Sequence, residues 1–188
     1  MRSTVEAAIW REGWLTAAAR LPSPNCDARP PGEPLELIVL HAISLPPGEF
    51  GGQHVGEFFC NALDACAHPY FAEIAAMRVS AHFFLDRNGV LMQFVSVHER
   101  AWHAGVSSWR RRSACNDFSI GIELEGCDEL PFTSAQYEAL DALLVPLVAL
   151  LPDKAPDRVV GHADIAPGRK TDPGPHFDWA RARRSLRA

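Results

Sequence analysis

Two histidines and one aspartate stand close to predicted strand ends and together offer the ligands of a catalytic metal site. His41 follows the apolar run at residues 35–40, and His162 follows the short run at residues 159–161. Asp172 comes ten residues after His162, just before a Pro-Gly-Pro turn. Two imidazoles and one carboxylate leave one tetrahedral position of a zinc ion open for water. The pattern predicts a zinc site, although the ordinary reading of a histidine pair is a core or surface role.

A predicted apolar strand at residues 118–124 carries carboxylates that suit the same chemistry. Because side chains alternate along a strand, Glu123 and Glu125 face away from the isoleucines at positions 120 and 122. A carboxylate beside a metal-activated water can take its proton and deliver it to a leaving amine. The strand therefore supplies a candidate acid/base, while Glu125 is equally well read as a charge at the rim of the sheet.

The elements that must position these residues are strands and helices in mixed order. Apolar and β-branched runs predict strands at residues 35–40, 79–85, 90–97, 118–124 and 159–161. Apolar residues at helical spacing predict a helix at residues 5–19, and further helices are expected at residues 54–65, 133–151 and 177–186. The predicted fold class is α/β, a single domain with a central mixed β-sheet flanked by helices.

Local signals mark the ends of several of these elements. Asn88-Gly89 lies between two predicted strands and predicts a tight hairpin, because this pair tolerates the positive φ that the turn requires. Thr133 and Gln136 have the spacing of a capping box at the start of a helix, and Pro146 should bend that helix. The basic tail at residues 177–186 is typical of a solvated helix face.

The first part of the chain is predicted to be an appendage on the main fold. Residues 21–34 contain five prolines, which exclude a helix interior or a central strand. We expect residues 1–34 to form an N-terminal helix and a Pro-rich arm that pack on a catalytic domain at residues 35–188. The whole chain would then be one globular unit.

Length, composition and charge exclude several classes of protein. The 188 residues are 47% hydrophobic and 22% charged, values that exclude a disordered chain, a fibrous repeat and a coiled coil. The net charge of −5 argues against nucleic-acid and membrane partners, and no apolar run approaches the roughly 20 residues of a membrane span. Five cysteines without a C-x-x-C pair, and no signal-peptide pattern, predict reduced thiols and a cytoplasmic location.

Four segments of the chain carry a resemblance to a known family. They are LPPGEFGG at residues 45–52, AWHAG at 101–105, NDFSIGIELEG at 116–126 and RKTDPGP at 169–175. With these segments the chain resembles the zinc-dependent N-acetylmuramoyl-L-alanine amidases, a family that includes the peptidoglycan recognition proteins. The resemblance runs from about residue 12 to residue 179.

The resemblance implies a reaction and a role for each candidate residue. His41, His162 and Asp172 fall on the zinc ligands of the family, Glu123 on its acid/base, and Lys170 on the cation that stabilises the oxyanion. One Zn²⁺ per chain would support hydrolysis of the amide between the lactyl group of (1,6-anhydro-)N-acetylmuramic acid and L-Ala of the stem peptide. The implied setting is cytoplasmic peptidoglycan recycling, with an indirect effect on β-lactamase induction.

An anhydro-muropeptide substrate also needs residues that bind its sugar and its peptide. Trp102 offers a flat apolar face, His103 a hydrogen-bonding edge and Arg78 a partner for a peptide carboxylate. Core packing of Trp102 and a plain surface position of Arg78 are the alternatives. The chain departs from some family members at Ala42, where they have Asn, and at Ala114, where they have Arg. We expect a monomer.

Two rival functions share this fold. One is a periplasmic or phage-type amidase that acts on polymeric peptidoglycan; the lack of a signal pattern and the cysteine usage argue against it. The other is a muropeptide-binding module without catalysis, which the three filled ligand positions disfavour.

Overall fold

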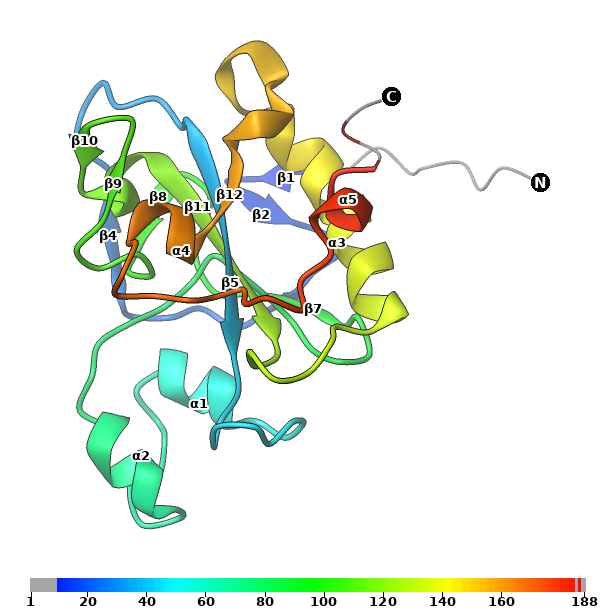
Figure 1. Ribbon diagram of the computed structural model, residues 1–188. Coiled ribbons are helices and arrows are strands. Elements are labelled where there is room, and N and C mark those ends of the chain that lie inside the picture. Colours follow the sequence, from blue (N-terminus) through cyan, green and yellow to red (C-terminus); the bar gives the residue numbers. More distant parts are fainter. Residues whose placement is uncertain (1–9, 185, 187–188) are drawn as a thin grey trace.

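The computed structural model describes residues 10–184 and residue 186, and its centre is a mixed six-stranded sheet (Figure 1). The strand order is β12 (Val159–Gly161), β5 (Leu37–Ile43), β11 (Ser119–Glu125), β6 (Phe83–Leu85), β7 (Leu91–Gln93) and β3 (Ala19–Arg20). The first four strands are parallel, β7 is antiparallel to β6, and β3 is parallel to β7. The predicted α/β class, one domain with a central mixed sheet and flanking helices, is confirmed.

Both faces of the central strands are buried. Alternate residues of β5 and β11, such as Leu40 and Ile122, pack with the apolar side of helix α3 (Ser134–Val148). The opposite face, which includes Leu37 and Val39, packs with helix α4 (His162–Ile165) and the segment before β11. Burial on both sides explains why β5 reads as a continuous apolar run rather than an alternating one.

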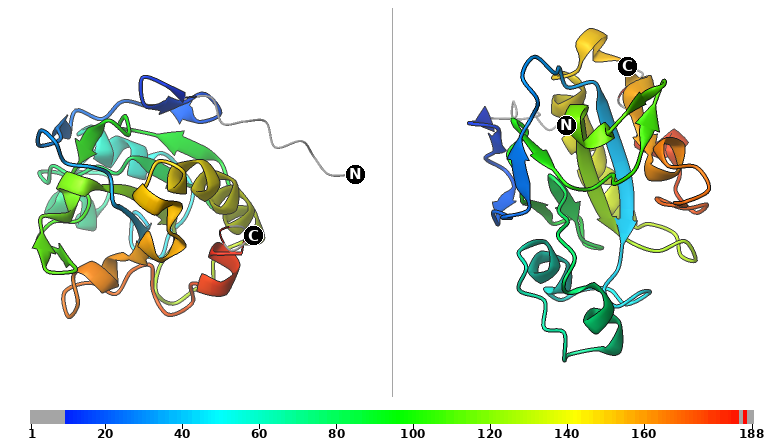
Figure 2. Two further views of the ribbon diagram at one scale, coloured as in Figure 1. Left: turned by 90° about the horizontal axis from the view of Figure 1, so that it is seen from above. Right: turned by 90° about the vertical axis from the view of Figure 1, so that its left-hand side faces the viewer.

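The four parallel strands end at the same edge of the sheet. Helices α1 (His54–Phe59) and α2 (Pro69–Ile74) lie together at that end, as two views show (Figures 1 and 2). They pack through a phenylalanine-rich cluster that includes Phe58, Phe71 and Phe94. The helix predicted at residues 54–65 is present but ends at Phe59. Ligand sites in open α/β sheets gather beyond the carboxyl ends of strands, so this end is the place to look.

Two local predictions are confirmed. Strands β6 and β7 form an antiparallel hairpin, and Asp86 accepts the backbone N–H of Gly89 at 3.0 Å. At the start of α3, Thr133 Oγ1 accepts from Gln136 N at 3.1 Å, and Gln136 Oε1 accepts from Thr133 N at 3.0 Å. Helix α3 contains Pro146 in its last turn and ends at Val148. Both strands of the hairpin are shorter than predicted.

Residues 5–9 of the helix predicted at residues 5–19 lie outside the described residues. For the rest of that segment the prediction is wrong. Residues 10–20 instead form β1 (Trp10–Arg11), β2 (Trp14–Leu15) and β3. Glu12 and Gly13 have φ of 51° and 78°, which turns β1 back onto β2. The side chain of Gln93 then holds the hairpin, because it accepts from Leu15 N and donates to Gly13 O.

The Pro-rich segment runs along the domain and contributes the edge strand β4 (Cys26–Ala28), which pairs with β8 (Glu99–Ala101). The helix predicted at residues 177–186 is also largely wrong, because α5 (Trp179–Ala182) is the one α-helical stretch among the described residues of this segment. Arg183 donates to Val159 O and lies over Trp179, so this part of the tail is not a free solvated face.

The remaining elements are β9 (Ser108–Trp109), β10 (Arg112–Ser113) and three short 3₁₀ turns, η1 (Cys115–Phe118), η2 (Pro152–Lys154) and η3 (Pro156–Arg158). None of the described helices has the length and apolar character that crossing a membrane requires.

Candidate active site

The donor atoms of His41, His162 and Asp172 converge at the carboxyl end of the sheet. His41 Nδ1 lies 2.9 Å from His162 Nδ1 and 3.2 Å from Asp172 Oδ2, and His162 Nδ1 lies 3.0 Å from the same oxygen. Both imidazoles are buried, and the Asp172 side chain is 15% exposed. His41 lies within β5, which continues two residues beyond it, whereas His162 opens α4 directly after β12.

This donor set fits a catalytic zinc ion. Two ligand atoms at about 2.0–2.1 Å from zinc and at a tetrahedral angle lie roughly 3.3 Å apart, close to the separations observed here. Two imidazoles and one carboxylate are also a common set for a catalytic zinc, because they leave one coordination position open. Among the described residues, the same cavity contains a buried carboxylate oxygen, Glu123 Oε2, that has no hydrogen-bond partner.

The charge states of His41 and Asp172 also suit a divalent cation. Burial lowers the pKa of His41 to about 4, so its imidazole is neutral at pH 7. Burial alone would raise the pKa of Asp172, but the adjacent His162 and His41 side chains outweigh it, and the net shift is downward. A neutral imidazole and an ionised carboxylate are the forms that bind metal.

Glu123 is placed beside these ligands by the register of the sheet. It lies opposite His41 in the parallel pairing of β11 with β5, and it is only 9% exposed. Burial raises the pKa of its carboxyl group well above the ordinary value, the nearby Asp172 carboxylate raises it further, and Lys170 opposes both. A carboxyl group with a raised pKa is suited to taking up a proton and releasing it again.

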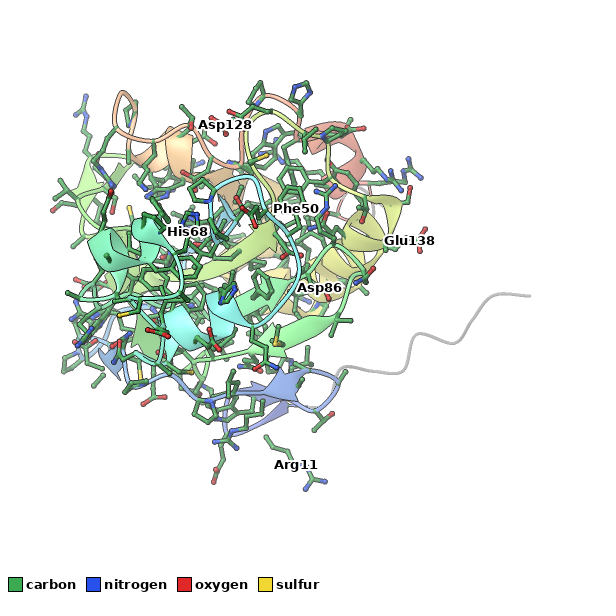
Figure 3. The ribbon with its side chains drawn as sticks, turned by 90° about the horizontal axis from the view of Figure 1, so that it is seen from below. Arg11, Phe50, His68, Asp86, Asp128 and Glu138 are labelled. Atoms are coloured by element: carbon green, nitrogen blue, oxygen red, sulfur yellow. The ribbon has the colours of Figure 1, made fainter. Side chains whose placement is uncertain are left out.

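The site opens into a cavity of about 350 Å³ with one polar side and one apolar side. Trp102 and Lys170, both predicted site residues, line it, and Lys170 is exposed. The apolar side is formed largely by α1, α2 and the segments next to them, including Tyr70 and Ile74. Seen from this end, α1, α2 and the loop that carries Phe50 face the viewer (Figure 3).

The surroundings of Arg78 and His103 bear on the binding roles predicted for them. Arg78 is exposed and donates to the carbonyls of Ala75 and Met77; its neighbours Met77 and Val79 line the cavity, but its own side chain is not part of the lining. His103 lines the cavity, yet its Nδ1 lies 2.9 Å from Nε2 of His41, so it also contacts this candidate ligand on the side of the ring opposite the Asp172 carboxylate.

Glu125, on the same strand, is not a rim charge. It is 4% exposed, and its two carboxylate oxygens accept the backbone N–H groups of Gly51 and Arg87. Gly51 belongs to the loop at residues 44–53, several residues of which line the cavity. Glu125 therefore holds the cavity loop to the sheet.

Sequence reasoning missed the groups that support the imidazoles. His162 Nε2 lies 3.2 Å from the carbonyl oxygen of Ala104, and Asn116 Oδ1 accepts from the backbone N–H groups of both His103 and Ala104. The role of the Ala104 carbonyl could not be predicted, because every residue type has the same backbone carbonyl group. Asn116 stands at the start of the third motif segment, so its position was visible but its role was not.

The amino-acid sequence of the chain is similar to those of known amidases. The family model described as N-acetylmuramoyl-L-alanine amidase (Amidase_2) matches residues 31–175. The chain is 56% identical to the 1,6-anhydro-N-acetylmuramyl-L-alanine amidase AmpD of Escherichia coli (strain K12), covering 93% of this chain and 95% of that protein. It is 52% identical to AmpD of Haemophilus influenzae (strain ATCC 51907 / DSM 11121 / KW20 / Rd), covering 90% of this chain and 92% of that protein.

Solved structures agree with the sequence comparison. The crystal structure of a selenomethionine AmpD derivative superposes with a TM-score of 0.90 at 54% identity, covering 95% of this chain and 98% of that chain. AmpDh3 from Pseudomonas aeruginosa, in complex with anhydromuramic pentapeptide, gives a TM-score of 0.60 at 30% identity, covering 83% of this chain and 61% of that chain. By sequence and by fold, this chain belongs to the N-acetylmuramoyl-L-alanine amidase family.

Proposed function

We propose that this protein is a zinc-dependent amidase that cleaves the amide between the lactyl group of 1,6-anhydro-N-acetylmuramic acid and L-Ala of the stem peptide. The observation that carries the proposal is the convergence of three ligand atoms beside the unpartnered oxygen of Glu123. The name of the AmpD relatives and the anhydromuramic pentapeptide bound by AmpDh3 support this choice of substrate.

Each candidate site residue has a separate role in the proposed hydrolysis of the amide. His41, His162 and Asp172 would hold the zinc ion, which when bound supplies a Lewis acid that polarises the scissile carbonyl and acidifies water. Glu123 takes the proton of the attacking water and delivers it to the departing nitrogen of L-Ala. Lys170 places its ammonium group near the negative charge that develops on the carbonyl oxygen, a contribution typically of several kcal/mol.

The cavity suits a substrate that presents both polar groups and apolar surface. Its volume of about 350 Å³ is in the range of small-molecule sites, so it can take the sugar and the first part of a peptide. Trp102 offers an apolar face for the anhydro-sugar. Contacts of Arg78 and His103 with the substrate remain predictions, and a complex with the reaction product would test them. Both ring nitrogens of His103 already have partners, His41 and Ser119, so its contact with the substrate would be made through ring carbon atoms.

The decisive test is Glu123→Gln, assayed with soluble anhydro-muropeptide. We expect unchanged zinc content and a loss of kcat of about 10²–10⁴-fold, because Gln keeps the shape but cannot carry the proton. Glu138→Gln, at an exposed position on α3 labelled in Figure 3, is the matched control and should keep parental activity. Parental turnover of Glu123→Gln would rule out the assigned role.

Substrate class and setting need separate measurements. Release of peptide from soluble anhydro-muropeptide should exceed release from intact sacculi, and the reverse preference would favour the polymer-directed alternative. We propose a cytoplasmic monomer; the five unpaired cysteines are compatible with a reducing compartment. Cell fractionation and sedimentation would test the location and the monomeric state.

A further inference from the structure

We infer that Ser119 and His103 form a directed hydrogen-bond chain that fixes the tautomer of His41 and so keeps its Nδ1 available to the metal. The inference rests on the metal-binding part of the proposed function and adds two positioning residues to it. It concerns the ring nitrogen of His41 that points away from the site.

The chain starts at the carbonyl oxygen of Cys115. Ser119 Oγ lies 2.6 Å from this oxygen, a separation that requires the hydroxyl hydrogen between them. A hydroxyl has one hydrogen, so Ser119 Oγ can only accept from its other neighbour. That neighbour is His103 Nε2 at 3.2 Å, which therefore carries the hydrogen.

The donor and acceptor roles at Ser119 determine the position of the ring hydrogen in His103 and then in His41. A neutral imidazole has one N–H and one acceptor nitrogen, so a hydrogen on His103 Nε2 leaves His103 Nδ1 as an acceptor. His41 Nε2 lies 2.9 Å from that nitrogen and must donate to it. The hydrogen of His41 is then on Nε2, and the lone pair of Nδ1 faces His162 and Asp172.

The surroundings of His103 hold the chain in place. Its backbone N–H is bonded to Asn116 Oδ1 at 3.1 Å. Its ring lies so close to β11 that a Cβ on Gly121 would come within 2.4 Å of Cγ of the ring. Glycine at this position is therefore required by the ring, not by the backbone, since Gly121 is an ordinary strand residue.

The two histidine ligands are supported differently. His162 Nε2 lies 3.2 Å from the carbonyl oxygen of Ala104, which can only accept, and farther, at 3.4 Å, from the Arg169 guanidinium, which itself donates to that carbonyl. The tautomer of His162 is thus set by the backbone, whereas that of His41 depends on two side chains. In Ser119→Ala, His103 loses the acceptor for its Nε2 hydrogen and can present an Nδ1 hydrogen to His41 instead, which moves the His41 hydrogen onto the ligand nitrogen.

Two measurements on the full-length protein test this inference. Zinc affinity is measured by competition with a chromophoric chelator, and we expect Ser119→Ala to weaken it about 10–100-fold, the usual effect of removing such a support. Ser23→Ala is the matched control: this buried hydroxyl also donates to a backbone carbonyl, that of Phe59, which has no hydrogen bond to the candidate zinc ligands or to His103. Its zinc affinity should equal that of the parent.

The second measurement is independent of zinc and of activity. Long-range ¹H–¹⁵N spectra of the metal-free parent should show the Nε2–H tautomer for both His41 and His103. Ser119→Ala should shift both rings toward the Nδ1–H form, and Ser23→Ala should not. An Nδ1–H tautomer of His41 in the parent, or parental zinc affinity in a folded Ser119→Ala, would overturn the inference. Should the parent bind no zinc, the proposed function fails, while the spectra still decide the hydrogen-bond chain.

Discussion

Adding one methyl group at Gly121 should damage the site without touching a metal ligand. The Cβ of Gly121→Ala would lie 2.4 Å from Cγ of His103 and 2.7 Å from its Cδ2 and Nδ1. Gly121 has an ordinary strand conformation, so alanine adds no backbone strain. The whole effect of the substitution therefore falls on the His103 ring.

The size of the effect follows from how far the ring must move. An ordinary carbon contact of at least 3.4 Å requires a shift of about 1 Å, since β11 is fixed by strands on both sides. Such overpacking costs roughly 1–3 kcal/mol, which lowers Tm by about 3–9 °C in a domain of this size. The shift also lengthens the 2.9 Å contact between His103 and His41, so zinc affinity should fall about 10-fold or more.

A double-mutant cycle separates the clash from other effects. Thermal unfolding is measured for Gly121→Ala, His103→Ala and the double variant, each without metal. Because alanine at position 103 removes the ring, the methyl group should cost far less in the double variant, and a coupling of about 1–3 kcal/mol is expected. Gly56→Ala is the control, because its Cβ would come closest to the flexible end of Leu21, at 3.2 Å, and would meet the Phe94 ring at an ordinary contact distance of 3.9 Å. Additive effects in the cycle, or a Gly121→Ala protein as stable as the parent, would refute the reasoning.

Three further outcomes are expected. Burial holds the pKa of His82 at about 3, below the unfolded value, so at this residue only the unfolded state binds a proton near pH 5. His82 alone should therefore lower stability by about 2 kcal/mol from pH 7 to pH 5, and His82→Asn should lose this part of the pH dependence in urea unfolding. The Glu125 carboxylate has two acceptor oxygens, one for Gly51 N–H and one for Arg87 N–H, whereas the side chain of Glu125→Gln has only one. The loop at residues 44–53 should therefore be held less firmly, and KM should rise with little change in kcat. An unchanged KM would contradict the role of Glu125 as a loop anchor. Lys170→Met should lower kcat and leave KM almost unchanged, since its charge acts on the transition state; an effect on KM alone would indicate a binding role.

Predictions from short-range signals agreed with the structure because their causes are local. The capping box of Thr133 and Gln136 and the turn at Asn88-Gly89 involve residues that are neighbours in the chain. Strand alternation likewise placed Glu123 on the face opposite Ile122. None of these features depends on how distant segments pack.

Predictions failed where a distant side chain decided the local structure. Residues 10–20 have apolar spacing that is compatible with a helix, but Gln93, 78 residues beyond Leu15, bonds to their backbone and holds a hairpin. The sequence also offered no means to see that His103 contacts His41, because 62 residues separate them. Competing interactions of this kind exist only in the folded chain.

The sequence by itself determined the kinds of chemical group at the site and the family to which the chain belongs. Donor types, a strand-borne carboxylate and four motif segments are properties of residue order, and they need no coordinates. The tertiary structure alone decided that Nδ1 atoms 121 residues apart meet at 2.9 Å, and which way each hydrogen bond behind them runs. The reason is physical: metal affinity depends on separations of a few tenths of an ångström and on single hydrogens, and only the packing of β5, β11 and β12 fixes these.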